Sequence, residues 1–178
     1  QLEAICDVVL EENKTRGDGE KKLYLLYDQI YWTLTFGDTV HYDPVKLRPE
    51  MKNYTVFIDG ISKAFAATGV RVGWSMGPRE IIEKMKAINS HVGAWAPMAE
   101  QKAVAKFLVK NNEVKKYLAA FKMEIEYRLR TIYDGFKALK KEGFPVEAIT
   151  PQAEIDLTGR SDLTGTREKE NTVKYKRE

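Results

Sequence analysis

The chain contains very few of the residues that form disulfides or bind transition metals. Its 178 residues include one cysteine, Cys6, and two histidines, His41 and His91. A single cysteine excludes an intrachain disulfide and favours a reducing compartment. Cys6 falls on the apolar side of a helical pattern, so we expect a buried structural thiol. The wide spacing of these three residues argues against a metal site built from them.

Strong charge and long apolar runs are also lacking. The formal net charge is only +3, and 43% of the residues are hydrophobic. Such a small charge gives no reason to expect nucleic acid or an anionic membrane as a partner. No apolar run approaches the length of a membrane span, and no secretory signal pattern is present. These features predict a soluble, cytoplasmic protein.

Both ends of the chain suggest that it is an internal piece of a longer protein. The sequence starts at Gln1 and enters a helical pattern at once, with apolar residues at helical spacing over residues 2–10. The last twenty residues, "GRSDLTGTREKENTVKYKRE", are polar and offer almost no core material. We expect this tail to be disordered.

Two short apolar runs predict neighbouring strands of an α/β sheet. Each of them, "LYLLYD" at residues 23–28 and "YTVFIDG" at residues 54–60, contains an acid at or next to its end. Continuous runs of this kind are typical of parallel strands buried on both faces. The connection between them, residues 36–53, is rich in turn residues and reads as irregular. Functional groups are then expected at the carboxyl ends of the strands.

The character of the chain changes to helical after residue 77. Helical patterns cover residues 78–89 and 98–111, and a third, at residues 112–143, could run as one long helix. A helix of roughly 28 residues is about 42 Å long and commonly connects a large domain to a smaller one. An alternating β pattern then begins at residue 144.

These patterns predict three parts of the chain. Residues 1–112 form the carboxyl-terminal part of a large domain, residues 113–142 a long connecting helix, and residues 143–178 the start of a small domain with a polar tail.

Five side chains near the predicted strand ends suit one kind of ligand. Lys63 is the lone lysine of the small-residue stretch "ISKAFAATGVRVGW"; desolvation there disfavours an ammonium, and a neutral amine is a nucleophile toward aldehydes. Asp28 can keep a pyridine nitrogen protonated, and Tyr31 can donate to a ring oxygen. Ser62 and Arg71 suit a phosphate ester. Together these groups fit pyridoxal 5′-phosphate.

The same residues carry a resemblance to a known family. "SKAFAATGVRVGW" resembles the lysine signature S-K-x-[FY]-[AG]-x-[TS]-G-x-R-x-G of class I/II aminotransferases, and "YDQIYWTLTF" resembles their upstream D-x-x-Y element. The resemblance covers residues 1–158 and is nearest to the aspartate aminotransferase-like branch. It implies part of a fold type I large domain, with a mostly parallel sheet flanked by helices, a connecting helix and the start of a small α+β domain.

The resemblance also implies a role for each site residue. Lys63 would hold the cofactor as a Schiff base and transfer the proton during catalysis. Asp28 would pair with the pyridinium nitrogen, Tyr31 would donate to the 3-oxygen, and Ser62 and Arg71 would hold the phosphate. The substrates would be an amino acid, with aspartate or an aromatic one expected, and a 2-oxo acid.

Assembly and activity are further implications of the resemblance. The family forms homodimers, and the segment "HVGAWAP" matches a region near the interface, with Trp95, Pro97 and Met98 expected to be exposed. Family elements expected upstream of Gln1 and a downstream carboxylate-binding arginine have no counterpart here, so we expect the chain alone to be inactive. Two alternatives stay open: a β-lyase of the same fold and a catalytically silent aminotransferase-like fragment.

Overall fold

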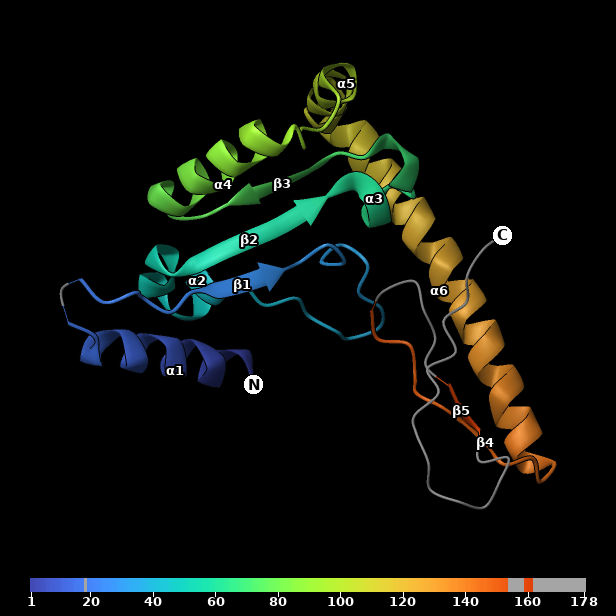
Figure 1. Ribbon diagram of the computed structural model, residues 1–178. Coiled ribbons are helices and arrows are strands. Elements are labelled where there is room, and N and C mark those ends of the chain that lie inside the picture. Colours follow the sequence, from blue (N-terminus) through green and yellow to red (C-terminus); the bar gives the residue numbers. More distant parts are fainter. Residues whose placement is uncertain (18, 154–158, 162–178) are drawn as a thin grey trace. The chain divides into compact units, whose positions relative to one another are not determined.

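The computed structural model describes residues 1–17, 19–153 and 159–161. The chain divides into two compact units (Figure 1). The first unit consists of Gln1–Trp32 with Val40–Lys110, and the second of Thr33–Thr39 with Asn111–Glu178. The predicted polar tail lies outside the described residues, apart from the short strand at residues 159–161.

A three-stranded sheet forms the centre of the first unit. Its strands are β1 (Leu25–Asp28), β2 (Thr55–Gly60) and β3 (Gly73–Met76), in the order β1-β2-β3. The two strands predicted from the apolar runs, β1 and β2, pair in parallel as expected. Strand β3 was not predicted, and it runs antiparallel to β2.

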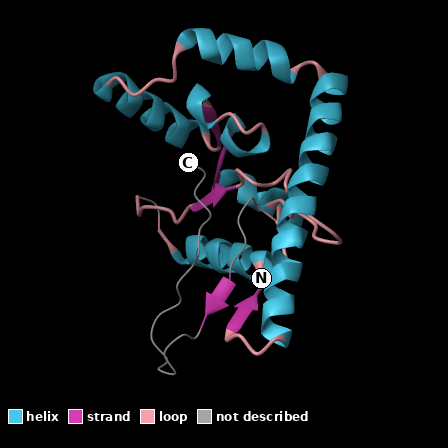
Figure 2. Cartoon of the chain, turned by 90° about the vertical axis from the view of Figure 1, so that its right-hand side faces the viewer, coloured by secondary structure: helices cyan, strands magenta, loops and turns pink. Residues whose placement is uncertain are grey.

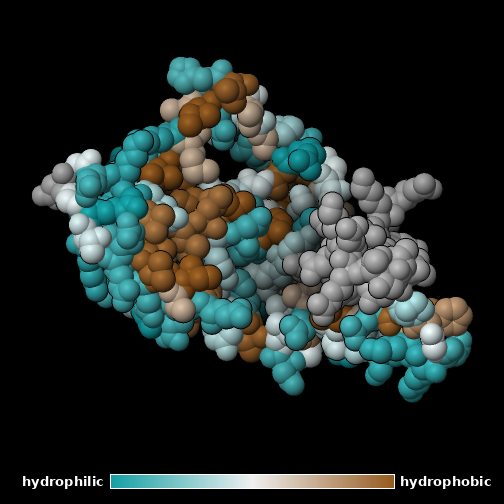
Figure 3. Space-filling view, turned by 60° about the horizontal axis from the view of Figure 1, so that its bottom comes forward, coloured by the Kyte–Doolittle hydropathy of each residue, from teal (hydrophilic) through white to brown (hydrophobic). Residues whose placement is uncertain are grey.

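The prediction that both parallel strands are buried on both faces is wrong for β1. Within β1, Leu26 is 67% exposed, whereas Val56, its partner in β2, is buried. The physical reason is position: β1 lies at an edge of the described sheet, and β2 lies between two neighbours. Leu26 is therefore an exposed apolar residue. Figure 3 shows hydrophobic areas, coloured brown, among hydrophilic ones on one face of the molecule.

Helices make up most of the rest of the first unit. They are α1 (Leu2–Thr15), α2 (Pro44–Leu47), η1 (Pro49–Asn53), α3 (Ile61–Ala64), η2 (Thr68–Val70), α4 (Arg79–Val92) and α5 (Met98–Leu108). The expected helices at residues 1–14, 78–89 and 98–111 are confirmed. No helix in the described part of the chain is both long and apolar enough to cross a membrane.

The connection before β2 is more regular than predicted. Residues 36–53 were expected to be irregular, but they contain α2 and η1. Asp43 caps α2, because its Oδ1 accepts the backbone N–H of Val45 at 2.8 Å and Pro44 occupies the first helical turn. Turn residues in this stretch thus start short helices instead of leaving the chain irregular.

Helix α1 packs on the first of two apolar clusters. The cluster contains Cys6, Val9 and Met51, which belong to α1 and η1 and are almost fully buried. Burial is the main reason why the pKa of the Cys6 thiol is raised. A buried thiol of this kind confirms the structural role expected for Cys6.

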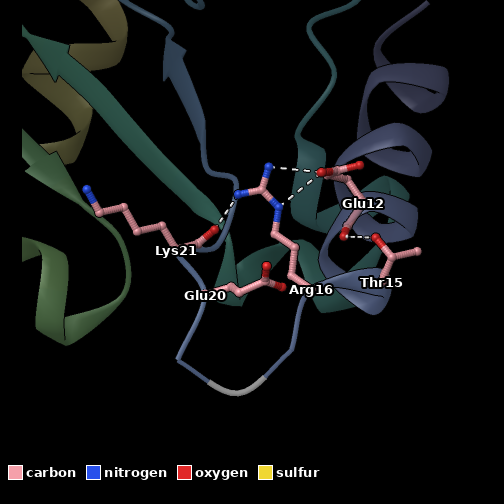
Figure 4. Close-up of a pocket in the computed structure, with 5 residues that line it drawn as sticks. All are labelled: Glu12, Thr15, Arg16, Glu20 and Lys21. Carbon is pink, nitrogen blue, oxygen red and sulfur yellow. Dashed lines mark hydrogen bonds and ion pairs between the residues drawn. The ribbon is translucent and has the colours of Figure 1, made fainter.

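The carboxyl end of α1 is held by polar contacts rather than by the core. Lys22 Nζ donates to the Arg16 carbonyl at 2.8 Å, close to the end of the helix. Beside it, a polar surface hollow is lined by Glu12, Thr15, Arg16, Glu20 and Lys21 (Figure 4). The Arg16 guanidinium donates to the Glu12 carboxylate at 2.9 Å, so its charge is already paired. None of the five predicted site residues lines this hollow.

The second unit contains the long helix that the sequence predicts. Helix α6 (Asn111–Lys141) has 31 residues, and the short strands β4 (Val146–Ala148) and β5 (Gly159–Ser161) pair antiparallel. Figure 2 shows these two strands beside the carboxyl-terminal end of α6. Lys140 of α6 and Glu147 of β4 form an ion pair of 2.7 Å. The expected helix is confirmed, and residues 154–158 of the expected β pattern lie outside the described residues.

Candidate active site

The predicted site residues lie around the carboxyl ends of β1 and β2. Asp28 is the last residue of β1, and Gly60 is the last residue of β2, three positions before Lys63. In the parallel register Asp28 lies opposite Ile58. Parallel neighbours present their carboxyl ends at the same edge of a sheet. The strand order therefore brings the Asp28 and Lys63 segments to one edge.

Lys63 lies on a single turn of helix that follows β2 directly. Ile61–Ala64 form α3, and the Phe65 N–H donates to the Ile61 carbonyl at 3.1 Å. The turn can start here because Gly60 has no side chain: a Cβ at this position would lie 3.0 Å from the Gly73 Cα and from the Val72 carbonyl oxygen. A side chain at residue 60 would thus push apart the backbone that positions Lys63.

Lys63 and Tyr31 are brought together by the structure. The Lys63 Nζ lies 5.6 Å from the centroid of the Tyr31 ring, which is within the range of cation–π contacts. Both side chains are half-buried. The Lys63 amine therefore lies close to the ring that carries the Tyr31 hydroxyl.

The turn after β1 places Tyr31 and defines the surroundings of Asp28. The Gln29 N–H donates to the Ile58 carbonyl at 3.0 Å, and the Trp32 N–H donates to the Gln29 carbonyl at 2.9 Å. Asp28 Oδ1 accepts the Ile30 N–H at 3.2 Å, so this carboxylate supports its own turn. Asp28 is otherwise exposed and can accept a further donor.

The two predicted phosphate ligands are less closely arranged. Ser62 lies in α3 directly before Lys63 and is half-buried. Arg71 adopts a left-handed backbone with φ of 57°, and its Nη1 donates to the Thr68 carbonyl at 2.8 Å. Over the described residues, no hydrogen bond or ion pair joins Arg71 to Ser62 or Asp28 to Lys63. Among the five predicted site residues, the described contacts thus join Lys63 with Tyr31.

Sequence reasoning missed Asp59, a buried acid next to this site. Its side chain is 8% exposed, and its pKa is raised mainly because burial disfavours the ionised carboxylate. Asp59 Oδ2 accepts the indole N–H of Trp32 at 3.0 Å, and Oδ1 accepts the N–H of Gly60 at 2.7 Å. The sequence does contain a signal for this residue, because Asp59 is a charged residue inside the apolar run "YTVFIDG".

Aromatic rings line the same face of the sheet beside Asp59. Tyr27 of β1 packs edge-on against Phe57 of β2, with ring centroids 5.8 Å apart. The His41 ring lies 5.9 Å from Tyr27 and 6.1 Å from Trp32. Burial lowers the pKa of His41, which favours the neutral imidazole. Trp32 therefore belongs to a group of aromatic rings beside Asp59.

The site lies at the carboxyl ends of two parallel strands in an α/β unit. An acid ends the first strand, and a lysine lies on the helical turn after the second. Ligands typically bind at such strand ends. The chain belongs to the family of class I and II aminotransferases, because residues 19–158 match the model described as "Aminotransferase class I and II".

Curated relatives agree with this family. The chain is 35% identical over 126 residues to an aspartate aminotransferase of Geobacillus stearothermophilus, a match that covers 67% of this chain and 31% of the relative. It is 31% identical over 150 residues to an aspartate aminotransferase of Bacillus subtilis, covering 80% of this chain and 35% of the relative. The chain thus spans about a third of the length of these curated relatives.

Solved structures show the same fold. An aromatic aminotransferase of Pyrococcus horikoshii superposes with a TM-score of 0.73 at 27% identity, covering 88% of this chain and 37% of that chain. A double mutant of the Thermus thermophilus aspartate aminotransferase gives a TM-score of 0.70 at 27% identity, covering 88% and 36% of the two chains. The chain therefore has part of the fold type I aminotransferase fold, as its two motifs indicate.

Proposed function

We propose that this chain belongs to a pyridoxal-phosphate-dependent aminotransferase that moves an amino group between an amino acid and a 2-oxo acid. The observation that carries the proposal is Lys63, held on the turn after β2 with its amine against the Tyr31 ring. The relatives named aspartate aminotransferase and the neighbour named aromatic aminotransferase support aspartate or an aromatic amino acid as substrate.

The residues present fit pyridoxal 5′-phosphate. The site offers one amine, one carboxylate, one phenol, one hydroxyl and one guanidinium, from Lys63, Asp28, Tyr31, Ser62 and Arg71. The exposed Asp28 carboxylate can accept a ring N–H, and the exposed Arg71 guanidinium can donate to phosphate oxygens. When bound, the cofactor supplies an electron sink that makes the Cα proton of an amino acid acidic.

The side chains of this chain would then bind, orient and move a proton. Lys63 Nζ would hold the cofactor through its aldehyde group and, once the substrate amino group has replaced it there, the freed amine would move the substrate Cα proton. Asp28 would keep a proton on the ring nitrogen, and the Tyr31 hydroxyl would donate to the ring oxygen. Ser62 and Arg71 would bind the phosphate and so fix the position of the ring.

The domain arrangement and assembly follow from the same proposal. Residues 1–112 would belong to the cofactor-binding large domain, residues 113–142 to the connecting helix, and residues 143–178 to the small domain. Trp95 is 50% exposed and Met98 is 69% exposed, which supports a homodimer contact at this loop. The single cysteine is consistent with the cytoplasm as the compartment.

The two alternatives have less support. A β-lyase would share the cofactor-binding residues, but the names of the curated relatives favour amino transfer. A silent fragment would have no need to keep Lys63, Asp28 and Tyr31 together. Incubating the cofactor-loaded protein with an amino acid that carries a leaving group on Cβ, such as cysteine, separates these reactions. Elimination expels that group and releases ammonia, whereas amino transfer yields a 2-oxo acid without ammonia.

Covalent labelling tests the proposal directly. The purified chain is mixed with pyridoxal phosphate, reduced with borohydride and mapped by peptide mass spectrometry. We expect the label on Lys63, loss of the label in Lys63→Ala, and an unchanged label in Lys84→Ala, an exposed lysine of α4. Labelling spread evenly over surface lysines, or full labelling of the Lys63→Ala protein, would contradict the proposed function.

A further inference from the structure

The buried carboxylate of Asp59 accepts hydrogen bonds from two different segments of the site. Its Oδ2 accepts the Trp32 indole N–H at 3.0 Å, and its Oδ1 accepts the Gly60 backbone N–H at 2.7 Å. Both carboxylate oxygens therefore have donors, as a buried acid requires.

Each donor adjoins a residue of the candidate site. Trp32 directly follows Tyr31, and Gly60 precedes the helical turn that carries Lys63. The Asp59 side chain thus joins the turn after β1 to the turn after β2 at the point where the Lys63 amine lies 5.6 Å from the Tyr31 ring. A backbone hydrogen bond also connects the turn after β1 to β2, because the Gln29 N–H donates to the Ile58 carbonyl.

Apolar packing alone does not explain the orientation of Trp32. Its side chain is 46% exposed, so much of the ring contributes no burial. The indole N–H nevertheless points to a carboxylate that is 8% exposed. An ionised acceptor in such a setting makes a stronger hydrogen bond than a neutral one. The contact is therefore what fixes the ring and, with it, the backbone of the preceding residue.

We propose that Asp59 is a positioning residue of the candidate active site, which holds Trp32 and Gly60 on its two oxygens and thereby fixes the Tyr31 phenol relative to the Lys63 amine. The role of Tyr31 and Lys63 in this statement rests on the proposed function. Trp32 and Gly60 donate to different oxygens of Asp59, and an asparagine in the same orientation places its NH2 group, a donor, against one of these two donors.

Charged and titratable neighbours define the conditions of the test. Burial has the largest effect on the pKa of the Asp59 carboxyl and raises it. Gly60, Trp32 and Gln29 lower this pKa, and the charge of Asp28 on β1 raises it further. Asp59 in turn acts on His41, whose pKa it raises against the effect of burial. Labelling rates are therefore compared at one and the same pH for all variants.

The test compares Asp59→Asn, Trp32→Phe and the double variant with Glu83→Gln, an exposed carboxylate of α4 as the matched control. The first readout is the rate at which pyridoxal phosphate labels Lys63. We expect the labelling rate of each single variant to fall about tenfold, which corresponds to the loss of a hydrogen bond to a charged group. The double variant should label no more slowly than the slower of the two single variants, because both remove the same link.

The second readout needs no cofactor. The indole N–H resonance of Trp32, identified by its loss in Trp32→Phe, is recorded by nitrogen-15 correlation NMR. We expect an upfield move of this resonance in Asp59→Asn and an unchanged position in Glu83→Gln. Trp32→Phe keeps a ring at position 32, so it tests the link even where Asp59→Asn lowers the folded fraction.

The outcomes separate the two ideas. Equal labelling rates in the unsubstituted chain and in both single variants would overturn the positioning role while leaving the proposed function intact. A drop in rate that only follows the folded fraction, measured by circular dichroism, would equally overturn it. Absence of Lys63 labelling in the unsubstituted chain would overturn the proposed function and the positioning role together.

Discussion

Arg48 forms a two-point ion pair with Asp7, a residue 41 positions earlier in the chain. Its Nε donates to Asp7 Oδ1 at 2.6 Å and its Nη2 donates to Oδ2 at 3.0 Å. Asp7 lies on α1 and Arg48 caps α2, so the pair joins the first helix to the connection that leads into β2. The hydrogen bonds from Arg48 are the main reason why the pKa of Asp7 is lowered.

Asp7→Asn should lower the thermal unfolding midpoint at neutral pH. A carboxyl whose pKa is lowered in the folded state stabilises the fold. This stabilisation is complete at a pH above the ordinary pKa of 3.8, and it is lost as the pH falls through the lowered pKa. The difference between the two proteins should therefore narrow in acid. Thermal denaturation over a pH series measures it, with Glu11→Gln as an exposed control on α1. A difference that stays constant down to strong acid would refute the ion-pair explanation.

Asn13→Ala should destabilise the first unit by about 1–3 kcal/mol, the range for leaving buried backbone groups unpaired. Asn13 is 5% exposed, and its amide both donates to the Leu23 carbonyl at 2.8 Å and accepts the Leu23 N–H at 2.7 Å. Denaturant titration measures the free energy of unfolding. The exposed Asn112→Ala serves as a control and should change it by less than about 0.5 kcal/mol. Equal effects of the two variants would count against this role.

Gly60→Ala and Gly135→Ala should have opposite effects on stability. A Cβ at Gly60 would meet backbone atoms at 3.0 Å, so we expect a loss of about 1–3 kcal/mol from forced backbone shifts. A Cβ at Gly135 in α6 would meet nothing within 4 Å, and alanine there should add about 0.5–1 kcal/mol through helix propensity. Denaturant titration of both variants checks the signs. A stable Gly60→Ala protein would show that the close approach to Gly73 is not required.

Glu80→Gln should make Tyr24 easier to ionise. The Tyr24 hydroxyl donates to Glu80 Oε1 at 2.7 Å, and this bond is the main reason why the pKa of Tyr24 is raised to about 12 from 10.0. Because the pKa of Tyr24 is raised in the folded state, its hydrogen bond to Glu80 stabilises the fold fully below pH 10. This stabilisation is lost as the pH rises through about 12. Alkaline ultraviolet titration measures the change, with Tyr24→Phe identifying the signal. Curves that coincide with and without Glu80 would reject the assignment.

Local patterns explain why several elements were predictable. The long helix α6 follows from helical spacing between residues three and four apart, and the structure extends it over Asn111–Lys141. The runs that form β1 and β2 likewise carry their signal in consecutive residues. The class of the protein was also accessible, since Ser62, Lys63 and Arg71 occupy fixed places of one contiguous motif.

Other features depend on contacts that no local pattern contains. Strand β3 has only four residues, starts at the last glycine of the lysine motif and is paired with β2, a partner that no local pattern shows. Helix α2 is capped by Asp43, and in a stretch so rich in turn residues the sequence does not distinguish such a cap from an ordinary turn. The exposure of Leu26 follows from the edge position of β1, which depends on which other strands the chain supplies.

Helical periodicity, apolar runs and a contiguous motif are properties of neighbouring residues, so the sequence was enough to predict α1, α4, α5, α6, the two parallel strands and the family. Tertiary structure alone decided that the Asp59 carboxylate receives the indole N–H of Trp32, 27 positions away. It also decided that the Lys63 amine meets the ring of Tyr31. Contacts of this kind are set by strand register and by the two turns that it brings together, and register is a relation between distant segments that no single segment encodes.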